Sequence, residues 1–163
     1  MTFAEKMKAQ AARANKHLVL AEGTELRTIQ AARKIVDEKL AKEVILVGNV
    51  EAVAKAAASV STCLEGITVI DPVTSEDRKA FALEYYELRK HKGMTEEEAF
   101  EGIVDPLRWG AMMVRLGKAD AMVAGAENTT GNVLLAAFNI IKTKPGIKYA
   151  SSCFVMATDK TQY

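Results

Sequence analysis

The chain of 163 residues has few cysteines and no long apolar run, and both features limit the classes of protein to which it can belong. Its two cysteines, Cys63 and Cys153, stand far apart without a CxxC pair. This pattern favours neither a disulfide framework nor a zinc site, so we expect no bound metal and two thiols packed as small apolar groups. Without a membrane-length apolar stretch or an apolar signal core at the N-terminus, we also expect a cytoplasmic protein.

The chain also lacks an excess of charge of either sign. Lys and Arg number 22 against 21 Asp and Glu, and the charges are interspersed along the sequence. Proteins that bind nucleic acid or anionic membranes usually carry a patch of basic residues, and this sequence shows no such cluster. We therefore expect neither nucleic acid nor a membrane as a partner. Hydrophobic residues make up 49% of the chain, which at this length suffices for one sizeable core.

Short apolar runs alternate along the chain with amphipathic stretches that begin at helix-capping residues. Thr95 with Glu98 has capping-box spacing, and Asp105 followed by Pro106 reads as an N-cap and a first helical residue. Such alternation predicts an α/β fold with a mainly parallel sheet flanked by helices. The strands are expected at residues 17–22, 43–48, 67–71, 119–124 and 149–157.

The segment from Ala119 to Asn132 carries the clearest chemical signal. An apolar strand runs into a loop rich in Gly, Asn and Thr, and a helix follows from about Asn132. Unpaired N–H groups at a helix N-terminus, together with nearby amide and hydroxyl donors, suit a phosphate or a carboxylate. The same residues also serve simply to turn a chain and cap a helix, and the sequence pattern leaves both interpretations open. The candidate anion-binding residues are Asn128, Thr129, Thr130, Gly131 and Asn132.

Several blocks resemble the phosphate acetyltransferase and phosphate butyryltransferase family in both order and spacing. They are LAEGTELRTIQAA (residues 20–32), VILVGN (44–49), YYELRKHKG (85–93), LGKADAMVAGA (116–126) and NIIKTKPG (139–146). The resemblance implies a two-domain α/β fold similar to isocitrate and isopropylmalate dehydrogenases. It also implies reversible acetyl transfer between acetyl-CoA and phosphate, in a cleft between the domains.

The resemblance covers the whole chain but only the front part of the family's protein. It implies that residues 1–146 form an N-terminal α/β domain without its C-terminal completing helices. Residues 147–163 then correspond to the first strand of a truncated second domain. Because no helix follows that strand to cover it, we expect it to drive association into a homodimer or a larger species.

The same resemblance assigns roles to residues. Arg89 lies where the family's ELRKHKG motif carries an arginine associated with CoA, and Asn128 to Asn132 fall on its phosphate loop. The implied partners are coenzyme A, acetyl-CoA, phosphate and acetyl phosphate, with coenzyme A as a substrate and no resident cofactor. The catalytic residues stay unidentified, because the family's Ser/Arg/Asp cluster lies later than this chain extends.

One departure from the family concerns Leu135, which stands with Ala136 and Ala137 where the family usually reads Arg-Pro-Ala. Loss of that phosphate-site arginine leaves two possibilities: Arg27, Arg89 or another cation compensates, or activity is impaired. Impaired activity would fit a second hypothesis, in which the chain is a non-catalytic regulatory domain of the same family that responds to acetyl-CoA. A third hypothesis is transfer of a butyryl group to phosphate. Either way, half of a cleft is expected to be a poor catalyst or none.

Overall fold

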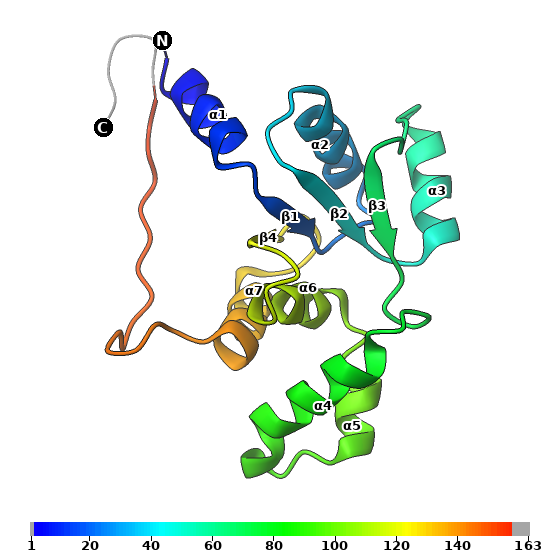
Figure 1. Ribbon diagram of the computed structural model, residues 1–163, viewed down its shortest axis with the longest axis vertical. Coiled ribbons are helices and arrows are strands. Elements are labelled where there is room, and N and C mark those ends of the chain that lie inside the picture. The colour runs from blue at the N-terminus through cyan, green and yellow to red at the C-terminus, as the bar shows by residue number, and fades with distance from the viewer. Residues whose placement is uncertain (1, 158–163) are drawn as a thin grey trace.

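A computed structural model describes residues 2–157 and contains a central parallel sheet (Figure 1). The sheet has four strands in the order β3-β2-β1-β4, and each neighbouring pair is parallel. An α/β architecture with a parallel sheet, as predicted, is therefore confirmed. The strands are β1 (His17–Leu20), β2 (Glu43–Val47), β3 (Ile67–Ile70) and β4 (Ala121–Val123).

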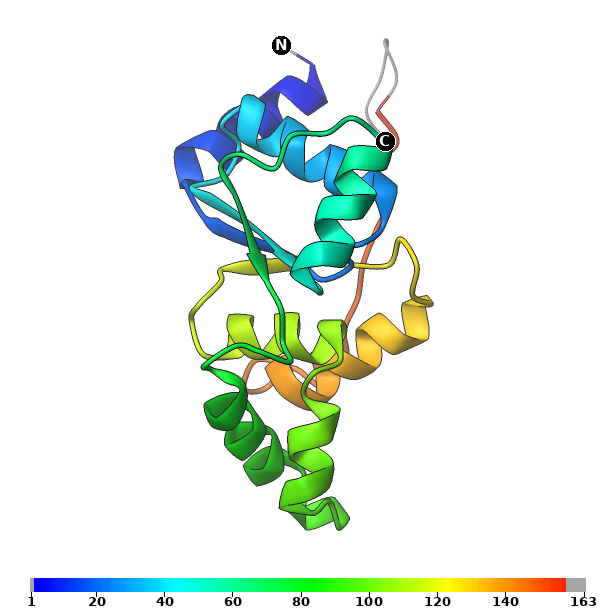
Figure 2. The ribbon, with the colours of Figure 1, turned by 90° about the vertical axis from the view of Figure 1, so that its right-hand side faces the viewer.

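Helices cover both faces of the sheet. On one face lie α2 (Leu26–Asp37) and α3 (Val50–Ser59), and on the other lie α6 (Pro106–Arg115) and α7 (Thr130–Ala136) (Figure 2). The apolar residues of the strands alternate between these faces, which is why the strands read as continuous apolar runs. In β2, for example, Ile45 packs toward α6 while Leu46 packs toward α2 and α3.

A helical hairpin extends away from the sheet beyond α6 (Figure 1). It consists of α4 (Arg78–Arg89), a 3-10 turn at Lys90–Lys92, and α5 (Glu96–Gly102). The short α7 continues directly into a π-helical turn, Ala137–Ile141, that packs against both α6 and α4. These contacts place the end of α4 beside the π-helical turn, although the two are far apart in sequence.

The capping residues begin helices where the sequence predicts. The Thr95 hydroxyl accepts a hydrogen bond from the Glu98 backbone N–H, and the Glu98 carboxylate accepts one from Thr95 in return. Asp105 accepts from the Arg108 backbone N–H, and Pro106 then opens α6. Helix α1 (Phe3–Ala14) likewise starts with a capping box but buries no residue. Local side-chain chemistry therefore fixes these boundaries.

The predicted strand at residues 149–157 is wrong. The chain forms no regular secondary structure from Ile147 to Met156, Ala157 makes only an isolated bridge, and the segment lies apart from the sheet (Figure 1). Tyr149 is 84% exposed and Phe154 is 93% exposed. An apolar run becomes a sheet strand only where a neighbouring strand pairs with it, and the described part of the chain supplies none. Residues 158–163 of the expected second-domain strand lie outside the described residues.

The prediction that both cysteines pack as apolar groups is also wrong. Cys63 and Cys153 are free and exposed. Cys63 lies in the connection between α3 and β3, and Cys153 lies in the extended C-terminal segment. Both positions fall outside the helices and strands that form the core, so neither thiol is buried.

Replacing Phe81 by alanine is expected to lower the free energy of unfolding by about 3–5 kcal/mol. Phe81 is 1% exposed, and its ring centroid lies 4.6 Å from that of Trp109 between α4 and α6. Urea unfolding followed by fluorescence of Trp109, the single tryptophan, measures the change. The matched control is Leu83→Ala, 59% exposed on the same helix, which should change stability by less than about 0.5 kcal/mol. Equal losses in the two variants would contradict this packing.

Candidate functional site

The Glu22 carboxylate, just beyond the end of β1, organises the loop that follows β4. Its Oε2 accepts hydrogen bonds from the backbone N–H groups of Gly125 at 2.8 Å and Ala126 at 2.7 Å. Its Oε1 accepts from the backbone N–H groups of Glu127 at 3.0 Å and Asn128 at 2.8 Å, and from Asn128 Nδ2 at 3.0 Å. The loop therefore wraps around a single carboxylate.

Glu22 is only 5% exposed, and it is the buried charged residue of the described chain. The backbone reaches it through Gly125, whose φ of +112° lies in a region that L side chains rarely adopt. The first N–H groups of the predicted anion loop thus bind an anion that the chain itself provides. Phosphate has to bind to other donors for as long as Glu22 stays in place.

These hydrogen bonds change the acidity of Glu22. Burial by itself raises the pKa of a carboxyl, but the hydrogen bonds from the Asn128 side chain and from the N–H groups of Ala126, Asn128 and Glu127 outweigh it. Together they lower the pKa of Glu22 to about 2. The carboxylate is therefore ionised at neutral pH.

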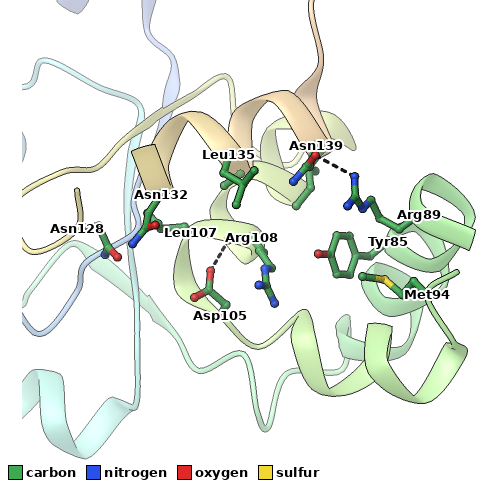
Figure 3. Close-up of a pocket in the computed structure, with 12 residues that line it drawn as sticks. Tyr85, Arg89, Met94, Asp105, Leu107, Arg108, Asn128, Asn132, Leu135 and Asn139 are labelled. Atoms are coloured by element: carbon green, nitrogen blue, oxygen red, sulfur yellow. Dashed lines mark hydrogen bonds between the residues drawn. The ribbon is translucent and has the colours of Figure 1, made fainter. Parts of the chain in front are cut away.

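Beside this loop lies a pocket of about 430 Å³ (Figure 3). Helix α4 forms one wall, the start of α6 forms the floor, and the loop with α7 and its π-helical turn forms the opposite wall. Its lining residues are Tyr85, Arg89, Met94, Asp105, Leu107, Arg108, Asn128, Asn132, Leu135, Ala136, Asn139 and Ile140.

Two half-buried arginines give the pocket positive charge. Arg89 Nη1 donates to Asn139 Oδ1 at 3.0 Å, while Arg89 Nε is buried and has no hydrogen-bond partner among residues 2–157. Arg108 Nη1 donates to the Gly102 carbonyl at 2.9 Å. Within that same range neither guanidinium forms a salt bridge. An anion entering the pocket would meet two guanidiniums that have no salt-bridge partner among these residues, although the Asp105 carboxylate also lines the pocket.

The structure brings some of the predicted site residues together and leaves others apart. Arg89, Asn128 and Asn132 line the same pocket. Thr129 is the N-cap of α7, and its hydroxyl accepts from the Asn132 backbone N–H at 3.3 Å. Thr129 does not line the pocket, and the same holds for two exposed residues of the first turn of α7, Thr130 and Gly131.

Leu135, where the resemblance led us to expect an arginine, also lines this pocket. Of the two arginines named as possible compensation, Arg89 lines the pocket and Arg27 does not. Arg27 instead pairs with Glu25 and donates to the Ala126 carbonyl at 2.7 Å, on the other side of the loop. Arg108 was not among the predicted site residues, although its position three residues after the Asp105 cap places it in the first turn of α6.

Two negative findings concern the part of the chain that the structure covers. Between residues 2 and 157, no helix has both the length and the hydrophobicity to cross a bilayer. Nor does any group of three or more His, Cys, Asp or Glu side chains gather there in a way that would hold a metal ion.

Replacing Glu22 by glutamine is expected to destabilise the protein at pH 7 by about 2–4 kcal/mol, because an amide nitrogen would face backbone N–H donors. The folded-state pKa of Glu22 lies below its ordinary 4.5, so its contribution is complete above about pH 4.5 and is lost as pH falls toward 2. That loss should amount to about 3 kcal/mol in the unmodified protein.

Urea unfolding between pH 2 and pH 7 tests this expectation. The stability difference between the unmodified chain and Glu22→Gln should shrink as pH falls from 4.5 toward 2. The matched control is Glu127→Gln, an exposed carboxylate on the same loop, which should change stability by less than about 0.5 kcal/mol. A Glu22→Gln variant as stable as this control would show that the carboxylate does not hold the loop.

Comparison with known proteins gives a consistent result. The family described as phosphate acetyl/butaryl transferase matches residues 2–163. The phosphate acetyltransferase of Treponema pallidum is 50% identical over 98% of this chain and 47% of its own length. The phosphate acetyltransferase of Acetivibrio thermocellus is 45% identical over 100% of this chain and 48% of its own length. The chain thus spans about half the length of these relatives.

Solved structures agree with the sequence comparison. The phosphotransacetylase EutD from Staphylococcus aureus has a TM-score of 0.88 at 33% identity, over 98% of this chain and 48% of that one. A phosphotransacetylase from Streptococcus pyogenes has a TM-score of 0.90 at 30% identity, over 100% and 50%. The chain therefore belongs to the phosphate acetyl/butyryl transferase family and corresponds to its N-terminal part.

Proposed function

We propose that this chain is the N-terminal half of a phosphate acetyltransferase, which transfers acetyl groups reversibly between coenzyme A and phosphate. Relatives that carry this name are 50% and 45% identical over nearly the whole chain. The observation that carries the proposal is the pocket in which Arg89 and two asparagines, Asn128 and Asn132, lie together with no carboxylate paired to the arginine. Guanidinium donors of this kind suit the oxygens of a phosphate, and the Asn132 side-chain amide can add a donor, whereas Asn128 Nδ2 already donates to Glu22.

The reaction makes clear what such a pocket contributes. The coenzyme A thiolate attacks the acetyl carbonyl carbon of acetyl phosphate, a C–S bond forms, and the C–O bond to phosphate breaks. Phosphate leaves with the bonding electron pair, so negative charge builds up on its oxygens. Donors fixed around those oxygens stabilise that charge and orient the acyl phosphate for attack. Arg89 serves the phosphate or coenzyme A side of this site, and the loop with Asn128 and Asn132 forms its opposite wall.

The rest of the reaction needs groups from outside this half of the protein. Deprotonation of the thiol calls for a base, and the acetyl oxyanion calls for donors. In this proposal both come from the second domain, which begins after residue 146 and closes the cleft over the pocket. The exposed apolar side chains of Tyr149 and Phe154 then become buried against that domain or against a second copy of the chain.

A second candidate function is supported by Leu135. With leucine in place of the family's arginine, the pocket has one cation fewer on the α7 wall. A domain of this kind that binds acetyl-CoA without turning it over would act as a regulatory module. The two functions share the pocket and differ in whether the acyl group is transferred.

An activity assay separates these functions. We expect the 163-residue chain alone to form acetyl-CoA from acetyl phosphate and coenzyme A at least about a hundredfold more slowly than a fusion that completes the cleft. The fusion joins residue 163 to the second half of the Treponema pallidum phosphate acetyltransferase, a 50% identical relative. Formation of the thioester is followed by its ultraviolet absorbance.

Equal turnover by the short chain would refute the proposal that it is half of a cleft enzyme. A folded fusion that binds acetyl-CoA without turnover would favour the regulatory module. The control is the full-length Treponema pallidum enzyme, assayed in the same buffer.

A further inference from the structure

Arg108 is held at the floor of the pocket by contacts that leave most of its donors available. Only its Nη1 is engaged, with the Gly102 carbonyl at 2.9 Å, while its backbone N–H serves the Asp105 cap. The Asp105 carboxylate also lines the pocket, but it accepts that backbone N–H and forms no salt bridge with Arg108 among residues 2–157. A guanidinium carries five N–H donors, so those on Nε and Nη2 stay free for a ligand.

A second arginine faces the same space from α4. Tyr85 and Arg89 lie four residues apart and so share one face of that helix. The Arg108 Cζ lies 5.8 Å from the centroid of the Tyr85 ring, and the ring lies between the two guanidiniums in Figure 3. The pocket is thus bordered by two cations from two different helices, and neither forms a salt bridge among residues 2–157.

Two partly desolvated cations at one pocket are unfavourable in the absence of an anion, because burial weakens their hydration and like charges repel. An anion with several oxygens relieves both costs at once. Opposite the arginines, Asn128 and Asn132 supply amide groups from the loop and from α7. The α7 wall itself contributes no charge at the lining position 135, which is leucine.

We propose that Arg108 binds the phosphate group of the substrate together with Arg89, and so supplies from α6 the positive charge that Leu135 does not supply from α7. This inference rests on the proposed function, because it assigns a second phosphate-binding cation to the same pocket. It makes Arg108 a determinant of phosphate affinity in this chain, separate from its contact with Gly102.

Titration of the 163-residue chain with inorganic phosphate, followed by amide chemical shifts at constant ionic strength, tests the proposal. Arg108→Gln removes the charge but keeps an amide donor for the Gly102 carbonyl, and it should weaken phosphate binding about tenfold or more. Arg108→Lys keeps the charge and should weaken binding by less than Arg108→Gln does. The double variant Arg108→Gln/Leu135→Arg returns a cation to the pocket from the opposite wall and should recover most of the lost affinity.

The matched control is Arg13→Gln, which removes the same charge from the exposed surface of α1 and should leave phosphate affinity unchanged. The inference is overturned if wild-type chain shows no saturable phosphate binding at the pocket, or if Arg108→Gln binds as tightly as wild type. It is also overturned if the control loses as much affinity, or if the double variant recovers none. Acetyl transfer by the fused protein is measured independently. The role of Arg108 can therefore be refuted while the proposed function is retained.

Discussion

The site depends on the five hydrogen bonds that the Glu22 carboxylate accepts from the loop at residues 125–128. They join the end of β1 to the segment after β4, across 103 to 106 residues of sequence. Because the loop leads directly into α7, this attachment fixes where α7 begins. The side chains of Asn128 and Asn132 reach the pocket as a result.

The charges of the site are compensated unequally. The buried carboxylate of Glu22 is surrounded by donors that lower its pKa to about 2, so its charge is fully satisfied within the protein. Among the described residues, the Arg89 guanidinium donates only to the side-chain oxygen of Asn139, and the Arg108 guanidinium donates only to the backbone carbonyl of Gly102. The protein therefore fills its own backbone anion site and leaves its cationic pocket open, which directs a substrate anion to the arginines.

Features specified by neighbouring residues were predictable from the sequence, and features that depend on distant contacts were not. The Thr95 capping box and the Asp105 cap are local, and so are the buried apolar strands of the parallel sheet. The prediction of a strand at residues 149–157 was wrong, because a strand forms only beside a neighbouring strand, and an apolar run does not specify that neighbour.

The features of the site also divide into those that the local sequence predicts and those that depend on distant contacts. A strand followed by a Gly/Asn/Thr loop predicted an anion-binding loop, but nothing local indicated that Glu22, about a hundred residues earlier, provides an anion for it. Arg108 was missed because its role depends on how the α4 hairpin packs beside α6 and α7. Its partners, the Gly102 carbonyl and the Tyr85 ring, become neighbours only in the folded chain.

A crystal structure of the chain with inorganic phosphate bound tests the central claim most directly. We expect phosphate oxygens within hydrogen-bond distance of both Arg89 and Arg108, with Glu22 still bound to the backbone N–H groups of residues 125–128. Phosphate bound to those N–H groups with Glu22 displaced, or phosphate bound outside the pocket, would contradict it.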